Sequence, residues 1–395
     1  MNKDWKYTLL MLVGLALMAS ILPVSALAEE TVKVGIVLPI TDPEAKSGEI
    51  EKQSFAMALE EINEAGGIKG KRLEFLVEDD NYDPEEGRLV VKRLITMQRV
   101  VMVGGGYSSS VTYAVSDVAQ QNRVPFLVNT AVADKITEQG WDYVFRLNPP
   151  ESERASGVES FLDEVVKPKS AVILHEKSSA GTRGAKFFNK SCDKLGIKVL
   201  MTEVYKPGSI DFKPILAKLK QVNPDIVFLI SSAKDGSLIM RQSQELKLSP
   251  KLFIGGAAGF TLPDFVQDAG KASEKVVTPT LWHQLLPLPG AMDYFNKFKA
   301  RYNKETNYHG AEAYAAAQVI ADALKRTKSL EPDDIKLALK ETDMMTVLGP
   351  VKFTSYKTKN NQNKLTTYVV QWQDGKLKLI WPRKLANAKY VFPVK

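Results

Sequence analysis

Cysteine is almost absent from this sequence. The single residue of this type, Cys192, excludes a disulfide within the chain, so the fold has to be stabilised by its hydrophobic core. Cys192 shares helical spacing with Ala185, Phe188 and Leu195, which places it on the inner face of a predicted helix. We therefore expect a buried structural thiol and not a reactive one.

Histidine is scarce as well, with three residues in a chain of 395. His175, His283 and His309 lie far apart, and none has the i, i+4 partner that a helical zinc motif uses. The sequence therefore predicts no metal site and no cofactor, and each histidine is interpreted as structural. A G-x-S-x-G motif for an acyl-transfer serine is also missing.

Two glycine-containing stretches approach nucleotide-binding motifs without matching them. In the first, Ala65 stands where a phosphate loop requires its first glycine, and Arg72 stands where it requires serine or threonine. In the second, Ser109 replaces the third glycine of a dinucleotide fingerprint that would begin at Gly104. Both departures argue against ATP and NAD as ligands.

The sequence has no long block of like charge. Its net charge is +7, but the lysines and arginines are interspersed with acidic residues. This distribution argues against a groove that binds nucleic acid.

The one long uncharged run, from Tyr7 to Ala28, follows Lys3 and Lys6 in the layout of a secretory signal. Its apolar centre is shorter than the roughly 20 residues that a spanning helix needs. We predict cleavage after Ala28 and export to the periplasm, with an uncleaved anchor as the alternative.

What is present is an alternation of short apolar runs with amphipathic stretches, the pattern of parallel sheets covered by helices. Removing 28 residues from 395 leaves 367, more than one core usually serves, so we expect two α/β lobes. The predicted strands are Val32–Leu38, Leu73–Val77, Val100–Val103 and Val124–Val128, then Ala171–Leu174, Val199–Val204, Ile226–Ile230 and Leu252–Ile254. Helices are predicted over Asp293–Tyr302 and Ala311–Leu324, and a β-hairpin over 365–381.

The run from Gly104 to Ser110 follows a predicted strand and opens a predicted helix. Its glycines allow close approach, and the free amides at the start of a helix attract an anion such as a carboxylate. The alternative is that Ser108 or Ser109 only caps the helix.

Ligands of open α/β sheets bind beyond the carboxyl ends of the strands, so every loop after a predicted strand is a candidate wall. Trp282, near an apparent return of the chain to the first lobe, is a candidate for stacking on a ligand or for packing. The candidate loop residues are Tyr107, Ser108 and Ser109, then Asn129 to Val132, Glu176 to Ala180, Ser231 to Lys234, and Gly256 to Ala258.

These features resemble the branched-chain amino-acid-binding family of periplasmic receptors, which feed ATP-driven (ABC) importers. The resemblance covers nearly all of the mature chain and is carried by Val34–Ile40, Ile62–Gly70, Asp79-Asp80 with Asp83-Pro84, and Ser108–Ser110. It implies the type I periplasmic binding protein fold, in which two doubly wound, Rossmann-like lobes are joined by a hinge of three crossings. On this basis we predict one lobe from residues 29–149 and 281–360, and the other from residues 150–280 and 361–395.

The resemblance also implies roles for single residues. In relatives that bind leucine, the serine matching Ser108 contacts the ligand carboxylate, and the loop matching Thr130-Ala131-Val132 supplies a carbonyl and a threonine hydroxyl. Here Val132 replaces that threonine. Ala257 stands where the relatives carry the glutamate that pairs with the α-ammonium group, and Ala180 and Ser232 replace two tyrosines.

We accordingly expect a receptor without cofactor or catalysis, monomeric, that delivers a small solute to the permease of an importer. Because an amino acid's ammonium group would lack its usual partners, the predicted ligand is an organic carboxylate without a free α-ammonium group. A sensory ligand-binding component and, less favoured, an enzyme on the same scaffold remain as alternatives.

Overall fold

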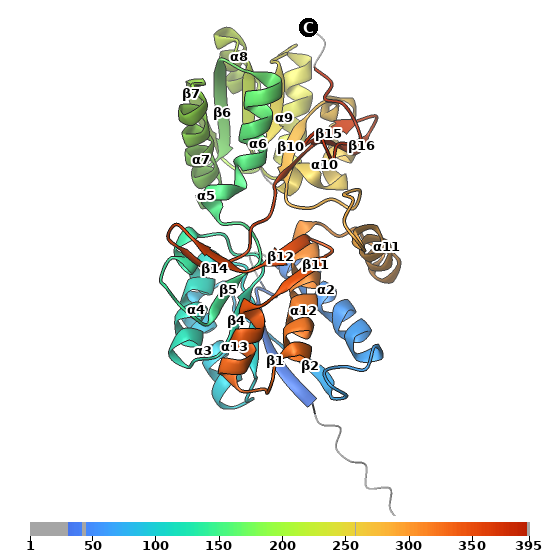
Figure 1. The fold of residues 1–395 in the computed structure, drawn as a ribbon. Coiled ribbons are helices and arrows are strands. Elements are labelled where there is room, and N and C mark those ends of the chain that lie inside the picture. Colours follow the sequence, from blue (N-terminus) through green and yellow to red (C-terminus); the bar gives the residue numbers. More distant parts are fainter. Residues whose placement is uncertain (1–30, 42–44, 257, 393–395) are drawn as a thin grey trace, which may run out of the picture.

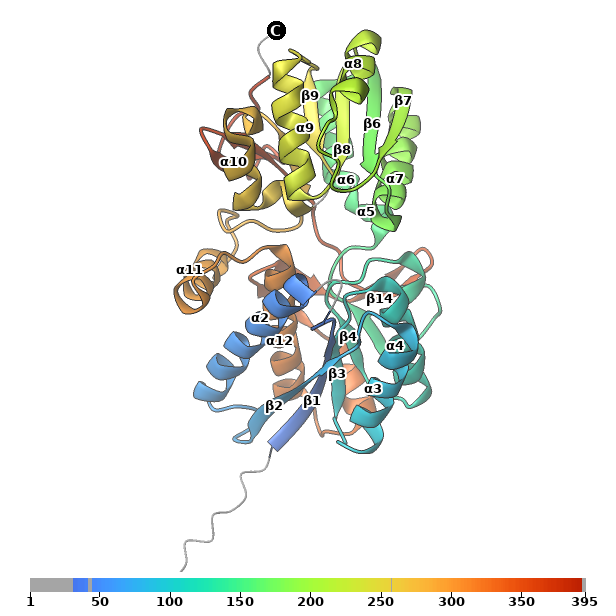
Figure 2. The same ribbon diagram turned by 180° about the vertical axis from the view of Figure 1, so that it is seen from behind.

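The computed structural model describes residues 31–41, 45–256 and 258–392, and it places two lobes one above the other (Figure 1). The predicted leader, residues 1–28, and Ala257 lie outside the described residues. Each lobe is built on a seven-stranded sheet with helices packed on both of its faces (Figure 2). The prediction of two doubly wound α/β lobes is confirmed.

The first lobe has the strand order β13-β14-β5-β4-β3-β1-β2. Every neighbouring pair is parallel except β13 with β14. Its strands are β1 (Thr31–Leu38), β2 (Arg72–Asp79), β3 (Met102–Gly105), β4 (Phe126–Val128), β5 (Val144–Arg146), β13 (Thr354–Tyr356) and β14 (Lys359–Gln362). Its helices include α2 (Ala45–Glu64), α3 (Pro84–Thr96), α4 (Ser109–Gln121), α12 (Tyr308–Arg326) and α13 (Pro332–Lys340).

The second lobe has the strand order β16-β15-β10-β9-β8-β6-β7, in which β15 is antiparallel to both of its neighbours. Its strands are β6 (Ser170–Glu176), β7 (Lys198–Tyr205), β8 (Ile226–Ile230), β9 (Leu252–Gly255), β10 (Val277–Thr280), β15 (Tyr368–Gln373) and β16 (Lys376–Trp381). Its helices include α6 (Ser156–Phe161), α7 (Ser179–Leu195), α8 (Lys213–Val222), α9 (Ala233–Glu245) and α10 (Pro263–Ala269).

The chain crosses between the two sheets three times: after β5, after β10 and after β14. The first crossing carries the short helix α5 (Glu151–Arg154), and the second leads into α11 (Ala291–Tyr302), which lies at the side of the junction (Figure 1). A small separate ribbon of β11 (Asp343–Thr346) and β12 (Gly349–Lys352) follows α13. The predicted hinge of three crossings is thereby confirmed.

The eight strands predicted in the two rounds are all present, although β3 begins at Met102 and β4 at Phe126, later than predicted. The C-terminal hairpin is β15 and β16, and it begins at Tyr368 instead of residue 365. Sequence patterns missed β5, β10 and β11 to β14, each of which has three or four residues and is too short to display a period of two. The equally short β3, β4 and β9 were found as continuous apolar runs.

Cys192 is fully buried on α7, in an apolar cluster that also contains Ala185 and Phe188. Burial raises the pKa of its thiol to about 12, so the thiolate is not formed at neutral pH. The prediction of a buried structural cysteine is confirmed.

Candidate functional site

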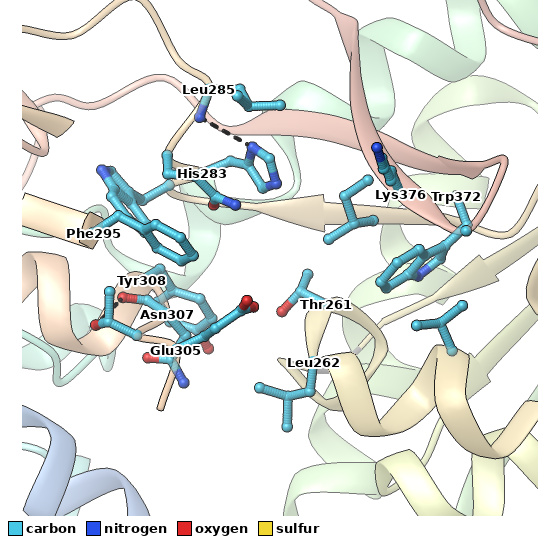
Figure 3. A pocket seen from close by; sticks show the side chains of 16 residues that line it. Thr261, Leu262, His283, Leu285, Phe295, Glu305, Asn307, Tyr308, Trp372 and Lys376 are labelled. Atoms are coloured by element: carbon cyan, nitrogen blue, oxygen red, sulfur yellow. Dashed lines mark hydrogen bonds between the residues drawn. The ribbon is translucent and has the colours of Figure 1, made fainter. Parts of the chain in front are cut away.

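A pocket of about 340 Å³ lies between the two lobes (Figure 3). Thr261 and Leu262 reach it from the second lobe, whereas Tyr308 reaches it from the start of α12 in the first. Aromatic rings and a few charged or polar side chains form its wall, the mixture that small-molecule sites commonly have. The principal wall residues are Trp282, Phe295, Tyr308, Trp372, His283, Glu305 and Lys376.

Trp282 lines this pocket, yet it is also a packing residue. Its indole Nε1 donates to the carbonyl oxygen of Val347 at 2.9 Å, and its ring packs edge-on against Tyr294 with the centroids 5.8 Å apart. The side chain is almost fully buried. Of the two roles considered for Trp282, packing is therefore established, and the ring also supplies part of the pocket wall.

The loop after β3 turns sharply into α4 through glycines with positive φ. Gly105 has φ 103° and lies so close to β1 that a Cβ there would stand 2.3 Å from the carbonyl oxygen of Val37. Ser108 occupies the N-cap position of α4, but its hydroxyl makes no capping hydrogen bond and lies 3.1 Å from the hydroxyl of Ser110. The alternative that Ser108 caps the helix with its side chain is wrong.

Ser109 joins two of the predicted candidate loops. Its hydroxyl oxygen accepts hydrogen bonds from the backbone amides of Val132 at 3.3 Å and Ala133 at 3.2 Å. The amide of Ala131 donates to the carbonyl of Gly106 at 2.9 Å. The predicted site residues of the first lobe are therefore brought together at one edge of its sheet. Ser109 connects the loop after β3 to the loop after β4.

Thr130 lies beside two buried carboxyl groups that the sequence patterns did not identify. Its hydroxyl oxygen is 2.8 Å from Oε1 of Glu51 and 3.1 Å from Oε2 of Glu312, and Nδ2 of Asn129 donates to it at 2.8 Å. A hydroxyl has one proton and cannot donate to both carboxylates. At least one of the two carboxyl groups must therefore carry a proton and donate to Thr130.

The electrostatics agree with this assignment. Desolvation by burial raises the pKa of Glu51 to about 8 and holds the pKa of Glu312 well above its usual range. Asn129 and Thr130 partly oppose the shift at Glu51 by hydrogen bonding. The hydroxyl of Thr130 is thus engaged inside the first lobe, and a ligand contact of this residue stays a prediction.

A row of rings extends from the β3 loop to the pocket. Tyr107 contacts His309 with centroids 5.3 Å apart, and His309 contacts Tyr308 at 4.1 Å. The guanidinium of Arg154 lies 5.6 Å from the centre of the Tyr308 ring. Burial lowers the pKa of His309 to about 3, so its imidazole is neutral in this row.

The predicted residues of the second lobe are less closely associated. Ser232 is exposed and caps α9, its hydroxyl accepting from the amide of Asp235 at 3.2 Å. Ala180 lies in the first turn of α7, and Ala257 falls outside the described residues. The carboxylate of Asp235 accepts from the amide of Gly208 at 3.0 Å, so this acid serves a neighbouring loop.

The acidic motif that supports the family resemblance has a structural role in this chain. The carboxylate of Asp79 accepts from the amides of Ile40 and Thr41 and so fastens the end of β1 to β2. Asp83 caps α3 by accepting from the amides of Glu85 and Glu86. The motif shapes the rim of the sheet.

Glu51, Glu312, Arg154 and Tyr308 were missed by the sequence patterns. A signal existed for the two glutamates, because each occupies a helix position that the 3.6-residue period assigns to the buried face. Arg154 and Tyr308 carried no such signal, since their contact joins segments 154 residues apart in sequence.

No group of three or more His, Cys, Asp or Glu side chains that could hold a metal ion occurs within residues 31–41, 45–256 and 258–392. Over the same residues, no helix is long and apolar enough to cross a membrane.

Two doubly wound lobes with a pocket between them define a two-lobed ligand-binding protein. The chain belongs to the periplasmic binding protein family, whose model matches residues 31–376, and it has the type I fold of that family. The family is one of extracytoplasmic solute-binding proteins. A Leu/Ile/Val-binding protein homolog 8 from Brucella melitensis is 30% identical over 400 residues, covering 96% of both chains.

Solved structures with the same fold contain different bound compounds. The branched-chain amino acid transporter substrate binding protein LivJ from Streptococcus pneumoniae, in complex with isoleucine, has a TM-score of 0.75 at 25% identity and covers 92% of this chain and 100% of its own. A solute binding protein of an ABC transporter from Rhodopseudomonas palustris, in complex with 3,4-dihydroxybenzoic acid, has a TM-score of 0.72 at 22% identity, covering 88% of this chain and 95% of its own.

Proposed function

We propose that this protein is the solute receptor of an ABC importer and that it closes its lobes around a small organic carboxylate without changing it chemically. The observation that carries the proposal is the pocket between the lobes, whose wall is built from both of them. A site divided between two lobes allows a ligand to stabilise the closed form, which a permease can then distinguish from the open one.

A carboxylate is favoured by the loop that starts α4. Its glycines bring the backbone close, its helix begins with free amides, and the Ser108 hydroxyl does not cap that helix. The ligands named for LivJ and for the Rhodopseudomonas protein, isoleucine and 3,4-dihydroxybenzoic acid, both carry a carboxyl group.

In the same proposal the ligand lacks a free α-ammonium group. Val132 offers no hydroxyl, and the residue at position 257 is alanine. The acids of the second-lobe rim are already engaged, Asp235 by the Gly208 amide and Glu176 by the Ser178 hydroxyl at 2.8 Å. The carboxylate of the pocket wall, Glu305, is also engaged, by Lys299 at 2.7 Å. An ammonium group desolvated here would have to compete with Lys299 for that partner, which is costly.

Further parts of the proposal concern export and assembly. Residues 1–28 act as a cleaved signal that sends the receptor to the periplasm, where it works as a monomer with a membrane permease. The predicted division gives residues 29–149 and 281–360 to one lobe and residues 150–280 and 361–395 to the other, and the strand β14 extends the first lobe to Gln362. The proposed contacts of the ligand are with Tyr107 and Ser108 in the first lobe and with the pocket wall around Trp282.

The test is mass spectrometry of the solute that co-purifies with the mature protein, followed by thermal-shift and calorimetric titration. The panel contains aliphatic and aromatic carboxylates, their amides, and the amino acids leucine, isoleucine, valine, phenylalanine and glutamate. Micromolar binding, about −8 kcal/mol, of a carboxylate but not of the amino acids is expected. Tight binding of an amino acid contradicts the ligand class, and turnover of a bound compound contradicts the receptor role.

A further inference from the structure

Arg154 is held at the junction of the lobes by the three residues that precede it. The amide of Glu151 donates to the carbonyl of Val132 at 2.8 Å, and the amide of Ser152 donates to the carboxylate of Asp134 at 3.2 Å. The carboxylate of Glu153 accepts from the hydroxyl of Tyr356 at 2.9 Å. The first crossing is thereby fixed on the candidate loop that follows β4, and Arg154 has a defined position beside it.

The guanidinium of Arg154 faces the row of rings that ends at the pocket. It lies 5.6 Å from the centre of the Tyr308 ring, and Tyr308 itself is part of the pocket wall. From Tyr308 the contacts continue through His309 to Tyr107, the neighbour of Ser108 in sequence. The cation therefore lies beside a residue of the pocket wall that is connected by ring contacts to the loop proposed to receive a carboxylate.

This cation lacks a close counter-ion within the described part of the chain. No described carboxylate lies within 4.0 Å of its guanidinium, and the neighbouring Glu151 has Arg183 at 4.0 Å. Arg154 does act electrostatically on Glu312, but burial raises the pKa of that carboxyl group well above its usual range and so disfavours its charged form. A half-buried guanidinium offers five donors in a planar fork that matches a carboxylate, and here the fork has no such partner.

We propose that Arg154 binds the anionic group of the ligand and makes the site selective for carboxylates over their uncharged amides. This inference rests on the proposed receptor function and names the residue that sets the charge of the ligand. The ring of Tyr308 lies 5.6 Å from the guanidinium, within the range of a cation–π contact, and the N–H groups of the guanidinium are the donors that would bind the anion. The anion would then be shared between Arg154 and the amide-rich start of α4.

The experiment compares wild type, Arg154→Gln, Arg154→Lys and the control Arg183→Gln by calorimetry. Arg183 is a matched control because it is a neighbouring arginine that is 59% exposed and lies outside the proposed site. The probes are benzoate, 3,4-dihydroxybenzoate and 4-methylpentanoate, each paired with its amide. Melting temperatures without ligand report whether each variant is folded.

Wild type and Arg183→Gln are expected to bind a carboxylate at least about tenfold more tightly than its amide. Arg154→Gln should weaken carboxylate binding by about 10- to 100-fold and leave amide binding unchanged, so that the preference disappears. Arg154→Lys should bind the carboxylate more weakly than wild type while keeping some preference, because lysine retains the charge without the fork.

The inference is overturned if folded Arg154→Gln binds the carboxylates as tightly as wild type does. If the glutamine variant does not fold, the same result in Arg154→Lys overturns it. Either result leaves the proposed function intact. If wild type binds the amides as tightly as the acids, the selectivity assigned to Arg154 is refuted directly. If wild type binds none of the probes, the proposed ligand class fails, and the inference that rests on it fails with it.

Discussion

At the scale of single residues, Ser108 is a side chain for which the structure removes one of the two roles considered, that of a helix cap. Its hydroxyl is free of the capping bond that serines at this position usually make. We expect Ser108→Ala to weaken a carboxylate ligand by about 0.5–3 kcal/mol, because one donor to the anion is lost while the helix amides remain. Calorimetry against the control Ser209→Ala measures this, and equal affinities would leave Ser108 without a ligand role.

The buried carboxyl pair makes stability depend on pH. Glu51 has a folded-state pKa of about 8, above its unfolded value of 4.5, so the folded protein binds the extra proton between these values. The stabilisation is complete below pH 4.5 and is lost as pH rises through 8, at up to about 1.4 kcal/mol per pH unit. The groups that face this carboxyl are Asn129, Thr130, Glu312 and Asp80.

Glu51→Gln should therefore flatten the pH dependence of the free energy of unfolding between pH 5 and 8 and should raise stability at pH 8. Glutamine keeps an acceptor for Asn129 and a donor for Thr130. Denaturant unfolding at a series of pH values measures the effect. Glu64→Gln, at the exposed end of the same helix, is the control, and identical pH profiles in wild type and Glu51→Gln would refute the assignment.

At the scale of elements, β3 depends on a glycine that no other residue can replace without strain. Gly105 combines φ 103° with a close approach to the paired strand, where a Cβ at this position would stand 2.3 Å from the carbonyl oxygen of Val37. Gly140 has a similar positive φ, 71°, but open space around it. Alanine substitutions at these two glycines therefore distinguish two contributions to the loss of stability. Gly140 reports the strain of a side chain at positive φ alone, whereas Gly105 adds the steric clash with Val37.

Gly140→Ala should cost about 1 kcal/mol, the usual penalty for a side chain at positive φ. Gly105→Ala should cost at least about 3 kcal/mol more, because β1 and β3 must also move apart. Denaturant unfolding of both variants tests this, with loss of soluble folded Gly105→Ala counted as agreement. Equal destabilisation would mean that the contact with Val37 relaxes at no cost.

The elements also show which parts of the fold could be predicted from sequence. Long strands such as β1 and periodic helices such as α12 are specified by local patterns, so they were found within a few residues of their ends. The three-residue β5 exists because β4 and β14 lie on either side of it, which no local window contains. The same limit applies to the site: the β3 loop was found, but the contact between Arg154 and Tyr308 is created by the tertiary fold alone.

At the scale of the whole molecule, the two lobes share one apolar network. A single buried cluster includes Phe260 and Trp372 from the second lobe, Trp282 from the second crossing, and Tyr294 from α11. The hydrogen bond from Trp372 Nε1 to the carbonyl of Phe260, at 2.8 Å, holds one wall of the pocket beside this network. A ligand in the pocket therefore acts on both lobes at once.

Ligand binding should consequently make the molecule more compact and raise the stability of both lobes in one transition. A carboxylate at a hundredfold excess over its Kd is expected to add about 2.7 kcal/mol to the free energy of unfolding. Small-angle scattering should give a smaller radius of gyration with ligand, because closure brings together the walls that Leu262 and Tyr308 supply from opposite lobes. Arg154→Gln should need more ligand to reach the same compact form, since it alters affinity and not the closed geometry. Two results would contradict this prediction: a scattering profile that saturating ligand does not change, or calorimetry in which only one lobe is stabilised. Either would show that the ligand occupies a single lobe and that the permease does not recognise the ligand-bound receptor by lobe closure.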